Sequence, residues 1–418
     1  MFTHLHLSSG YSFKYGTAQP DALVARAAEN GMGAIALTDR DGMAGAITFA
    51  QSCEAHGIAP ILGVNLSFIQ KKYRVTLLAQ SGKLPALYRL ITAMNRSNNE
   101  NLLTYEILKE YSEYSSQLFL LHGHESQLAQ TIASRKYDSA LSIYNSTQDL
   151  FAEQIIECTS HLVRGDGPLS TPYAARALGF ARDHKLPTVL TNAARMLNRA
   201  DGPVADVLDA SRLLVPLHQS RVERSNSEGY LKNDTEMRFV ADEIARMAGE
   251  RDGGTLLAQT ESFAQMCHLS PRRDIGIGGV HLPESSVVGA KNHAEMSAQL
   301  RSRAEAGLSK RYSSAQSVDA SIRLEEELAT IRTLGFESYF LTVADITDMA
   351  RSRGIRVAAR GSGAGSLTCY LLGISGVEPM SQGLLMERFC STLRGELPDI
   401  DIDVESARRL EIYDAIFE

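Results

Sequence analysis

Three aspartates near the end of the 418-residue chain are spaced so that they could hold divalent cations. They alternate with aliphatic residues from Leu397 to Val404. Alternate side chains of a β-strand share a face, so we expect Asp399, Asp401 and Asp403 on one face and the aliphatic residues in the core. Carboxylates on one strand face repel one another, and Mg²⁺ relieves that repulsion while leaving coordination positions for phosphate oxygens. The alternative is an acidic, solvated edge strand.

A glycine- and serine-rich turn precedes these aspartates. It follows a short apolar run and precedes a helix-like run, Leu367 to Ile374. Glycines between a strand and a helix let backbone N–H groups converge on an anion. The turn is not a Walker A loop, because no Gly-Lys-Ser/Thr ends it, and on its own it could be a simple turn. The candidate phosphate-binding residues are Arg360, Gly361, Ser362, Gly363 and Ser366, and Ser366 also suits the N-cap position.

The arginines beside the turn extend this prediction. They are Arg351, Arg353, Arg356 and Arg360. They could form a solvated helix end, but arginine is suited to forked contacts with phosphate, and we favour a triphosphate or DNA-backbone contact. A phosphate-binding turn and paired carboxylates are together the equipment for nucleotidyl transfer.

Three motifs in order resemble the palm of the bacterial C-family replicative polymerases, the DNA polymerase III alpha subunits. They are the segments 360–366, 384–389 and 398–403. Residues 323–341 are similar to the helix that opens that palm, and residues 404–409 resemble the error-prone branch. The resemblance implies DNA-templated addition of deoxynucleotides to a primer 3′ end. It assigns two Mg²⁺ ions to Asp401 and Asp403, with Asp399 as a less certain third member, and the phosphates to the glycine turn.

The same resemblance implies partners and further chain. Primer-template DNA and dNTPs would be the substrates, and other replication or repair proteins, including a sliding clamp, would be partners. The family continues with more palm, a thumb and fingers. We therefore expect the 418 residues to be the C-terminally truncated front portion of a polymerase, without polymerase activity alone.

Two histidines at the start of the chain form a second candidate site. His4 and His6 alternate in a strand-like segment, and Asp39 and Asp41 follow a buried-strand run. Strand-like and helix-like segments then alternate, which predicts parallel βαβ units with active groups at the carboxyl ends of the strands. A Zn²⁺ or Mn²⁺ site on these four residues is one interpretation. A hydrogen-bonded histidine pair is the other, and we favour it.

The segments 4–6, 36–39 and 191–192 resemble the PHP domain, which begins the C-family polymerases. This implies an α/β fold: a distorted PHP-type (β/α) barrel over residues 1–270, then a partial α+β palm over residues 271–418. The sequence departs from the PHP pattern, since Arg40, Asn65, Ala193 and Arg195 stand where metal ligands are expected. A guanidinium opposes neighbouring metal ions, so we expect the metal cluster to be degraded.

Two other functions remain open for this barrel. One is a PHP-type metal-dependent phosphoesterase or 3′-5′ exonuclease, which needs an intact ring of ligands. The other is a non-catalytic structural or interaction module. His122 and His124 form another alternating pair, at a predicted strand end; it could be a ligand site, but we favour ordinary surface-loop histidines. His161 and His184 are expected to be partly exposed.

Composition is that of an ordinary globular protein. Hydrophobic residues make up 44% and charged residues 22%. The net charge of −7 provides no global basic field, so contact with DNA must come from local patches. The five scattered cysteines suggest reduced, buried thiols, and no apolar run is long enough to span a bilayer, so we expect a cytoplasmic protein.

Overall fold

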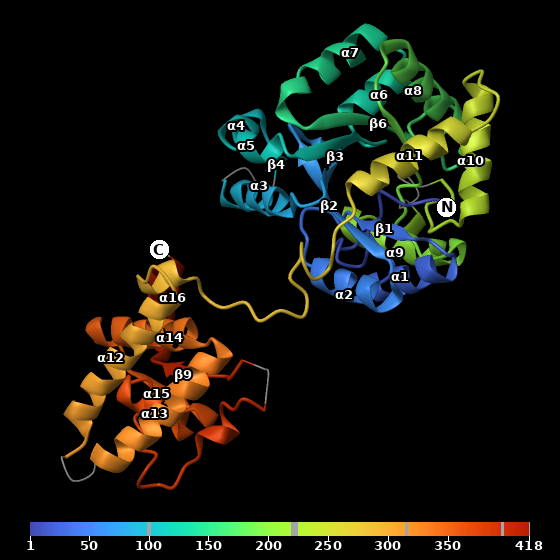
Figure 1. The fold of residues 1–418 in the computed structure, drawn as a ribbon. Coiled ribbons are helices and arrows are strands. Elements are labelled where there is room, and N and C mark those ends of the chain that lie inside the picture. Colours follow the sequence, from blue (N-terminus) through green and yellow to red (C-terminus); the bar gives the residue numbers. More distant parts are fainter. Residues whose placement is uncertain (98–101, 219–224, 314–316, 394–396, 418) are drawn as a thin grey trace. The chain divides into compact units, whose positions relative to one another are not determined.

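The computed structural model describes residues 1–97, 102–218, 225–313, 317–393 and 397–417. The chain divides into two compact units, Met1–Gly278 and Gly279–Glu418. The sequence-based expectation placed this boundary at 270/271. Figure 1 shows the elements of each unit, which are described separately below.

The first unit is built on one curled sheet. Its strands are β1 (Ala34–Leu37), β2 (Ala59–Phe68), β3 (Gln70–Ala79), β4 (Leu102–Leu103), β5 (Leu118–His122), β6 (Glu153–Thr159) and β7 (Thr188–Thr191). The order is β1-β2-β3-β5-β6-β7, with β4 beside β2. The β1/β2, β5/β6 and β6/β7 pairs are parallel, as expected.

The expectation of parallel units throughout was wrong for β3. This strand is antiparallel to both β2 and β5. It follows β2 through a tight turn at Ile69, whose φ of 61° is positive. So short a connection leaves no room for the crossover that parallel strands need.

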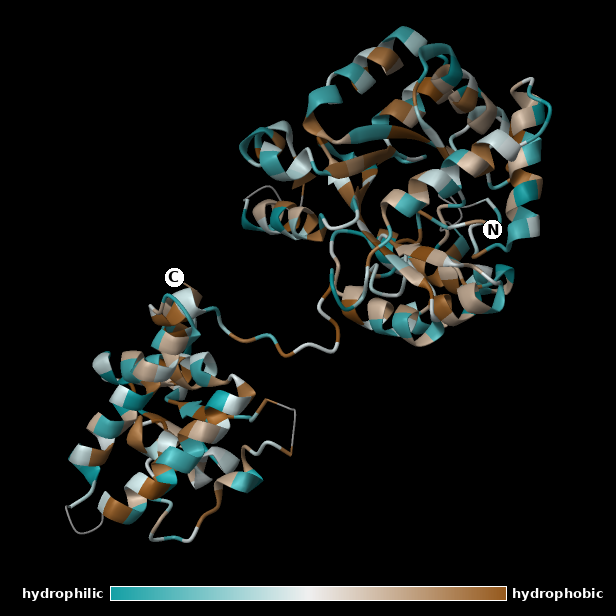
Figure 2. Cartoon of the chain, viewed as in Figure 1, coloured by the Kyte–Doolittle hydropathy of each residue, from teal (hydrophilic) through white to brown (hydrophobic). Residues whose placement is uncertain are grey.

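Helices cover this sheet (Figure 1). They are α1 (Pro20–Glu29), α2 (Ala46–His56), α3 (Leu84–Arg96), α4 (Tyr105–Glu110), α5 (Ser112–Ser115), α6 (Gln127–Ala133), α7 (Tyr137–Asn145), α8 (Thr171–His184), α9 (Gly202–Leu213), α10 (Asp234–Met247) and α11 (Gly254–Met266). Hydrophobic residues are concentrated on the strands (Figure 2). Fully buried Leu23, Phe49 and Leu62 belong to one large core cluster beneath α1 and α2.

The N-terminal segment joins the two ends of the curled sheet. The expected strand over Phe2 to Leu7 is extended chain that forms only an isolated bridge, between Leu7 and Ala194. The carbonyl of His4 accepts from the Ala36 amide at 2.9 Å, and that of His6 accepts from the Ala194 amide at 3.1 Å. Both histidines are thereby placed where β1 and the segment after β7 meet.

The second unit combines helices with a two-stranded antiparallel ribbon, in agreement with the expected α+β class. The ribbon is β8 (Val357–Arg360) and β9 (Asp401–Val404). The helices are α12 (His293–Arg311), α13 (Ser317–Leu334), α14 (Glu337–Ser352), α15 (Leu367–Leu371) and α16 (Arg409–Phe417). Buried Leu324, Phe340 and Leu367 contribute to its core.

Candidate functional site

The register of the β8–β9 ribbon explains how the two aspartates are displayed. Arg360 pairs with Asp401, and Ala358 pairs with Asp403. These four residues share a face, because side chains alternate along both strands. On the opposite face, Ile402 packs against the core of the unit. The alternating pattern therefore separates the acidic and aliphatic faces as predicted.

One guanidinium contacts both carboxylates. Arg360 Nη1 lies 3.0 Å from Asp401 Oδ2, and Arg360 Nε lies 3.1 Å from Asp403 Oδ1. Asp401 is directly opposite Arg360 and Asp403 is diagonal to it, which a long side chain can reach. The two carboxylates therefore converge on a single cationic group.

Asp399 does not join this arrangement. The strand was expected from Leu397, but β9 begins only at Asp401. Its partner β8 ends at Arg360, and Gly361 then turns the chain with a φ of +73°. With no strand opposite it, Asp399 lies before the paired segment and is exposed.

The glycine turn lies against the aspartate face. Residues Gly361–Gly365 form a single 3₁₀ turn between β8 and α15. A Cβ added to Gly361 would lie 3.3 Å from Asp401 Oδ2, so the turn and the carboxylate are in direct contact distance. The candidate phosphate residues Arg360, Gly361 and Ser362 are exposed, whereas Gly363 is buried.

Ser366 is the predicted N-cap, but it is not an open phosphate contact. Its hydroxyl accepts from the Cys369 amide at 3.1 Å and donates to Glu327 at 2.9 Å. Glu327 also accepts from the Leu367 and Thr368 amides, each at 2.8 Å. A buried carboxylate thus takes the donors at the start of α15, so a phosphate there would have to displace it.

Residues in the segments that resemble the polymerase palm contact the glycine turn and the segment after it. Arg323 on α13 pairs with Glu327 at 3.1 Å and donates to the carbonyls of Gly365 and Leu384. A Cβ at Gly365 would lie 2.9 Å from the Leu385 carbonyl. The resemblance drew attention to residues 323–341, but the sequence did not predict that Glu327 within them is buried.

In the first unit, His6 is paired with a carboxylate that sequence reasoning missed. His6 Nδ1 lies 2.8 Å from Glu157 Oε1, on β6. The Thr191 hydroxyl also donates to that oxygen. Burial alone would raise the pKa of Glu157, but the charge and hydrogen bond of His6 lower it. The signal available was a glutamate that follows two isoleucines inside a buried strand.

His4 is held by a backbone contact and not by a metal-binding group. Its Nε2 donates a hydrogen bond to the backbone carbonyl oxygen of Lys232 at 2.8 Å. Burial lowers the pKa of His4 to about 4, so the ring is neutral at pH 7. His4 and His6 thus face different partners, in line with the favoured hydrogen-bonded interpretation.

The two candidate aspartates are also engaged by the protein. Asp39 accepts from the hydroxyls of Ser9 and Ser12 at 2.8 and 2.7 Å, and burial raises its pKa. Asp41 pairs with Arg74 at 2.8 Å. Neither carboxylate is directed at the histidine pair by any of these contacts.

Two arginines lie in the region where β1 and the segment after β7 meet, which we call the mouth. Each of them forms an ion pair with a carboxylate of the same unit. Arg40 contacts both oxygens of Glu125 at 2.7 Å, and Arg195 pairs with buried Asp209 at 2.7 Å. Their guanidinium carbons lie 3.4 and 4.3 Å from the centre of the Tyr15 ring. Burial would raise the pKa of Glu125, but the charge of Arg40 and its neighbours lowers it to about 2.

A buried lysine adds a third internal cation. Lys232 is 2% exposed, and its ammonium donates to Asn192 Oδ1 at 3.2 Å and pairs with Glu228 at 3.1 Å. Burial lowers the pKa of Lys232, and the Glu228 charge opposes that shift. The nearby His161, expected to be partly exposed, is buried, and His122 is buried rather than in a surface loop.

These contacts test whether the mouth fits a metal cluster. Within the described ranges, no three His, Cys, Asp or Glu side chains gather so as to hold a metal ion. The carboxylates in this mouth already have cationic partners: Glu125 is paired with Arg40, Asp209 with Arg195 and Glu228 with Lys232. The residues present therefore do not fit the PHP ion cluster.

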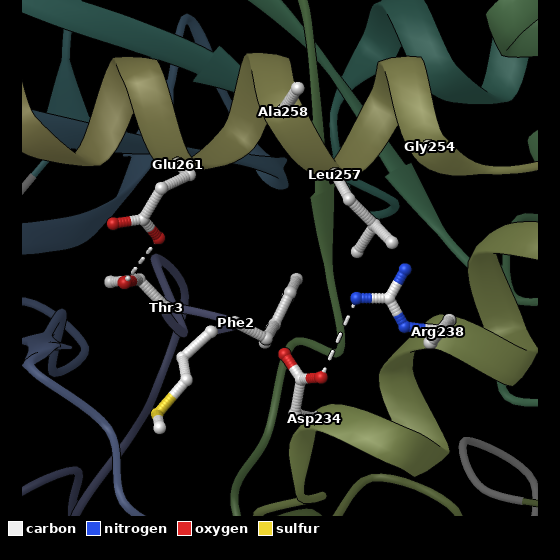
Figure 3. Close-up of a pocket in the computed structure, with 9 residues that line it drawn as sticks. Phe2, Thr3, Asp234, Arg238, Gly254, Leu257, Ala258 and Glu261 are labelled. Atoms are coloured by element: carbon white, nitrogen blue, oxygen red, sulfur yellow. Dashed lines mark hydrogen bonds and ion pairs between the residues drawn. The ribbon is translucent and has the colours of Figure 1, made fainter.

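Two of the cavities in the first unit adjoin the mouth or the N-terminal segment. One of about 430 Å³ opens at the mouth beside Tyr15, His124, Glu125 and Arg195. The other, of about 230 Å³, is lined by the N-terminal residues, α10 and α11 (Figure 3). In it Glu261 accepts from the Thr3 hydroxyl at 3.1 Å, and Asp234 lies 3.6 Å from Arg238, so its carboxylates already have partners.

Other sequence-based expectations concern the environment. All five cysteines are free and buried, as predicted. No helix in the part of the chain that the structure describes has the length and apolarity of a membrane span.

Family comparisons agree with the two-unit organisation. The PHP domain family matches residues 4–161, and the family described as bacterial DNA polymerase III alpha NTPase domain matches residues 298–418. The class of protein is therefore one in which a PHP domain precedes a domain shared with polymerase alpha subunits.

Relatives match the whole chain. An error-prone DNA polymerase of Symbiobacterium thermophilum is 33% identical, over 98% of this chain and 38% of that protein. An error-prone DNA polymerase of Bordetella parapertussis is 29% identical over 100% and 38%, and a DNA polymerase III subunit alpha of Buchnera aphidicola is 28% identical over 99% and 36%. The chain is a homologue of the bacterial C-family DNA polymerases, the DNA polymerase III alpha and error-prone DNA polymerase group, and spans less than two fifths of the length of these relatives.

Solved structures show a weaker likeness. A two-domain protein of Bacteroides vulgatus, described as containing a predicted PHP-like metal-dependent phosphoesterase, is 16% identical with a TM-score of 0.32. It covers 47% of this chain and 52% of that one, and this likeness carries no functional argument.

Proposed function

We propose that the second unit supplies the metal- and nucleotide-binding face of a DNA-directed DNA polymerase. The observation that carries the proposal is the convergence of Asp401 and Asp403 on one cationic group beside the glycine turn. A guanidinium lies between the two carboxylates. A divalent metal ion is also positively charged, so the same position is suited to it. Two carboxylates on one face of the ribbon, beside a turn with exposed backbone, support this assignment.

The roles of the residues follow from this geometry. Asp401 and Asp403 would hold Mg²⁺, which when bound supplies charge neutralisation for a primer hydroxyl and for the leaving pyrophosphate. Gly361 and Ser362 would bring exposed backbone donors to the triphosphate, and Arg360 would neutralise its charge. Ser366 and the amides after it hold Glu327, so we leave them out of the phosphate site.

The wider role rests on the relatives. Primer-template DNA and dNTPs are the proposed substrates, in error-prone repair synthesis or replication, and clamp and other replication proteins are the proposed partners in the cytoplasm. Because the chain spans 38% of the relatives' length, polymerase activity is proposed for the whole protein that contains these units.

The test uses the 418-residue chain and a fluorescent dNTP with Mg²⁺. We expect saturable binding that Asp401→Asn and Asp403→Asn abolish, while Asp399→Asn has a smaller effect. Primer extension is measured in parallel, and we expect none from the chain alone. Binding that is indifferent to Asp401 and Asp403 would refute the proposed site.

For the first unit we propose a non-catalytic structural or interaction module in place of a phosphoesterase. The observation that favours this is the set of internal ion pairs formed by Arg40, Arg195 and Lys232. Assay of the chain with a 3′-labelled single strand and Mn²⁺ or Zn²⁺ is expected to show no metal-dependent hydrolysis. Hydrolysis that His6→Ala removes would instead restore the exonuclease alternative.

A further inference from the structure

The β8–β9 ribbon contains its own counterion at the place where the proposed function puts a metal. Arg360 contacts Asp401 at 3.0 Å and Asp403 at 3.1 Å through two different nitrogens. A forked contact of this kind satisfies both carboxylates at once and offsets their mutual repulsion. The metal-free pair is therefore stable without any ion from solution.

We infer that Arg360 is a gate on this site: it competes with the first divalent cation for the two aspartates and is released toward the nucleotide when that cation binds. The inference rests on the proposed function, because it assumes that Asp401 and Asp403 hold the metal. It assigns to Arg360 a second role, in the empty site, that phosphate binding alone does not require.

The accessibility of these groups makes the exchange feasible. The Arg360 side chain is 61% exposed, and those of Asp401 and Asp403 are 36% and 66% exposed. Ion pairs this open to solvent contribute little stability, so displacing the guanidinium costs little. The guanidinium is carried on a long, flexible side chain, so it can leave the aspartates by moving away.

The released side chain has a destination nearby. Arg360 is followed at once by the glycine turn, and Gly361 is close enough for its added Cβ to lie 3.3 Å from Asp401 Oδ2. A short rotation would carry the guanidinium from the carboxylates to a triphosphate seated on that turn. Metal binding and nucleotide binding would then favour each other, because each removes a competitor of the other.

The inference predicts effects of opposite sign from one substitution. Arg360→Gln should tighten binding of Mn²⁺, used as the probe, by about five- to tenfold, the effect of removing one cationic charge a few ångströms away. The same substitution should weaken binding of a fluorescent dNTP. A merely structural role for Arg360 would weaken both.

A matched control is available on the same segment. Arg356 precedes β8, its side chain is 89% exposed, and its Nε lies 3.8 Å from Glu405 Oε2. Arg356→Gln changes the net charge of the chain by the same amount, so it reports the general electrostatic effect. We expect it to leave Mn²⁺ affinity close to that of the parent chain.

The experiment measures Mn²⁺ binding by electron paramagnetic resonance on the full 418-residue chain, with circular dichroism as the folding check. Equal or weaker Mn²⁺ binding by Arg360→Gln than by Arg356→Gln would overturn the gate, even if Asp401→Asn abolishes binding. Binding unaffected by Asp401→Asn and Asp403→Asn would overturn the proposed metal site itself. Arg360→Lys, which keeps the charge without the fork, should give an intermediate affinity, and tightening equal to that of Arg360→Gln would also contradict the gate.

Discussion

The Ser366 hydroxyl donates a hydrogen bond to the buried carboxylate of Glu327 at 2.9 Å. The same carboxylate accepts hydrogen bonds from the two backbone amides that follow Ser366, those of Leu367 and Thr368. Glu327 on α13 therefore completes the N-terminus of α15 from a distant part of the sequence, and it fixes the helix on which the glycine turn depends.

Glu327→Gln should destabilise the second unit by about 2–4 kcal/mol, because it leaves buried donors unsatisfied and removes the partner of Arg323. The measurement is urea-dependent labelling of the buried Cys369 thiol, resolved by mass spectrometry. Glu326→Gln, at an exposed position on the same helix, is the control and should change stability by less than about 0.5 kcal/mol. Equal effects of the two variants would contradict the capping role.

Gly307→Ala should also destabilise the second unit. A Cβ at Gly307 on α12 would lie 2.1 Å from the Leu371 carbonyl oxygen of α15, so the two helices would have to separate. The strain should exceed the gain of about 1 kcal/mol in helix propensity. Gly179→Ala in α8 is the control, since its nearest neighbour is the Arg182 side chain at 3.8 Å, and it should leave its own unit equally or more stable. Unfolding curves from Cys369 and from buried Met237 report the two units separately.

The first unit should lose stability in mild acid. Burial lowers the pKa values of His4 and His122 to about 4, below the ordinary histidine pKa of about 6.5. Between pH 6.5 and 4 the unfolded chain binds protons that the folded chain does not. The free energy of unfolding therefore has its full value above pH 6.5 and falls as the pH drops toward 4. The slope is at most about 1.4 kcal/mol per pH unit for each histidine.

This pH dependence can be measured from urea curves of Met237 oxidation between pH 4 and 7. His122→Gln removes one titrating group and should reduce the slope in that window. An unchanged slope in the variant would show that His122 is not a source of the acid sensitivity.

Removing metal ions should leave the first unit intact. Arg40, Arg195 and Lys232 already balance Glu125, Asp209 and Glu228. Dialysis against EDTA is therefore expected to leave the urea midpoint of Met237 oxidation unchanged. A lower midpoint that Zn²⁺ or Mn²⁺ restores would show that a metal stabilises this unit.

Replacing one of the internal cations should destabilise the first unit, whereas removing metal ions should not. Arg40→Met leaves the Glu125 carboxylate without its main partner and removes the contact with Tyr15. We expect a loss of about 1–3 kcal/mol that metal ions do not recover. Arg238→Met, which loses an exposed pair with Asp234, is the control and should cost less than about 1 kcal/mol.

Local patterns predicted much of the fold. The run from Leu367 to Ile374 was expected as a helix with Ser366 as its N-cap, and Leu367–Leu371 forms α15 with that cap, because a capping serine before apolar residues is a local signal. The alternation around Asp401 and Ile402 likewise predicted which face is buried. The antiparallel direction of β3 was missed, because the tight turn that sets it is at Ile69, a residue type that rarely takes a positive φ.

The partners of the candidate site residues could not be predicted in the same way. Glu157 and Lys232 meet His6 and His4 only after more than 150 residues of chain have folded. Glu327 is one of three successive glutamates, and only the packing of α13 decides which of them is buried. The sequence shows which side chains carry charge, whereas the choice of partner depends on the tertiary structure.

The aspartate pair is carried by strands of only four residues each. A free-standing ribbon of this length is marginal in water, so its shape depends on how well Ile402 is anchored beneath it. Trimming that aliphatic anchor would let the two carboxylates drift apart without altering either of them. A substitution on the aliphatic face of the ribbon can therefore reduce the ion affinity of the acidic face. Mutagenesis restricted to charged residues would not find this cause.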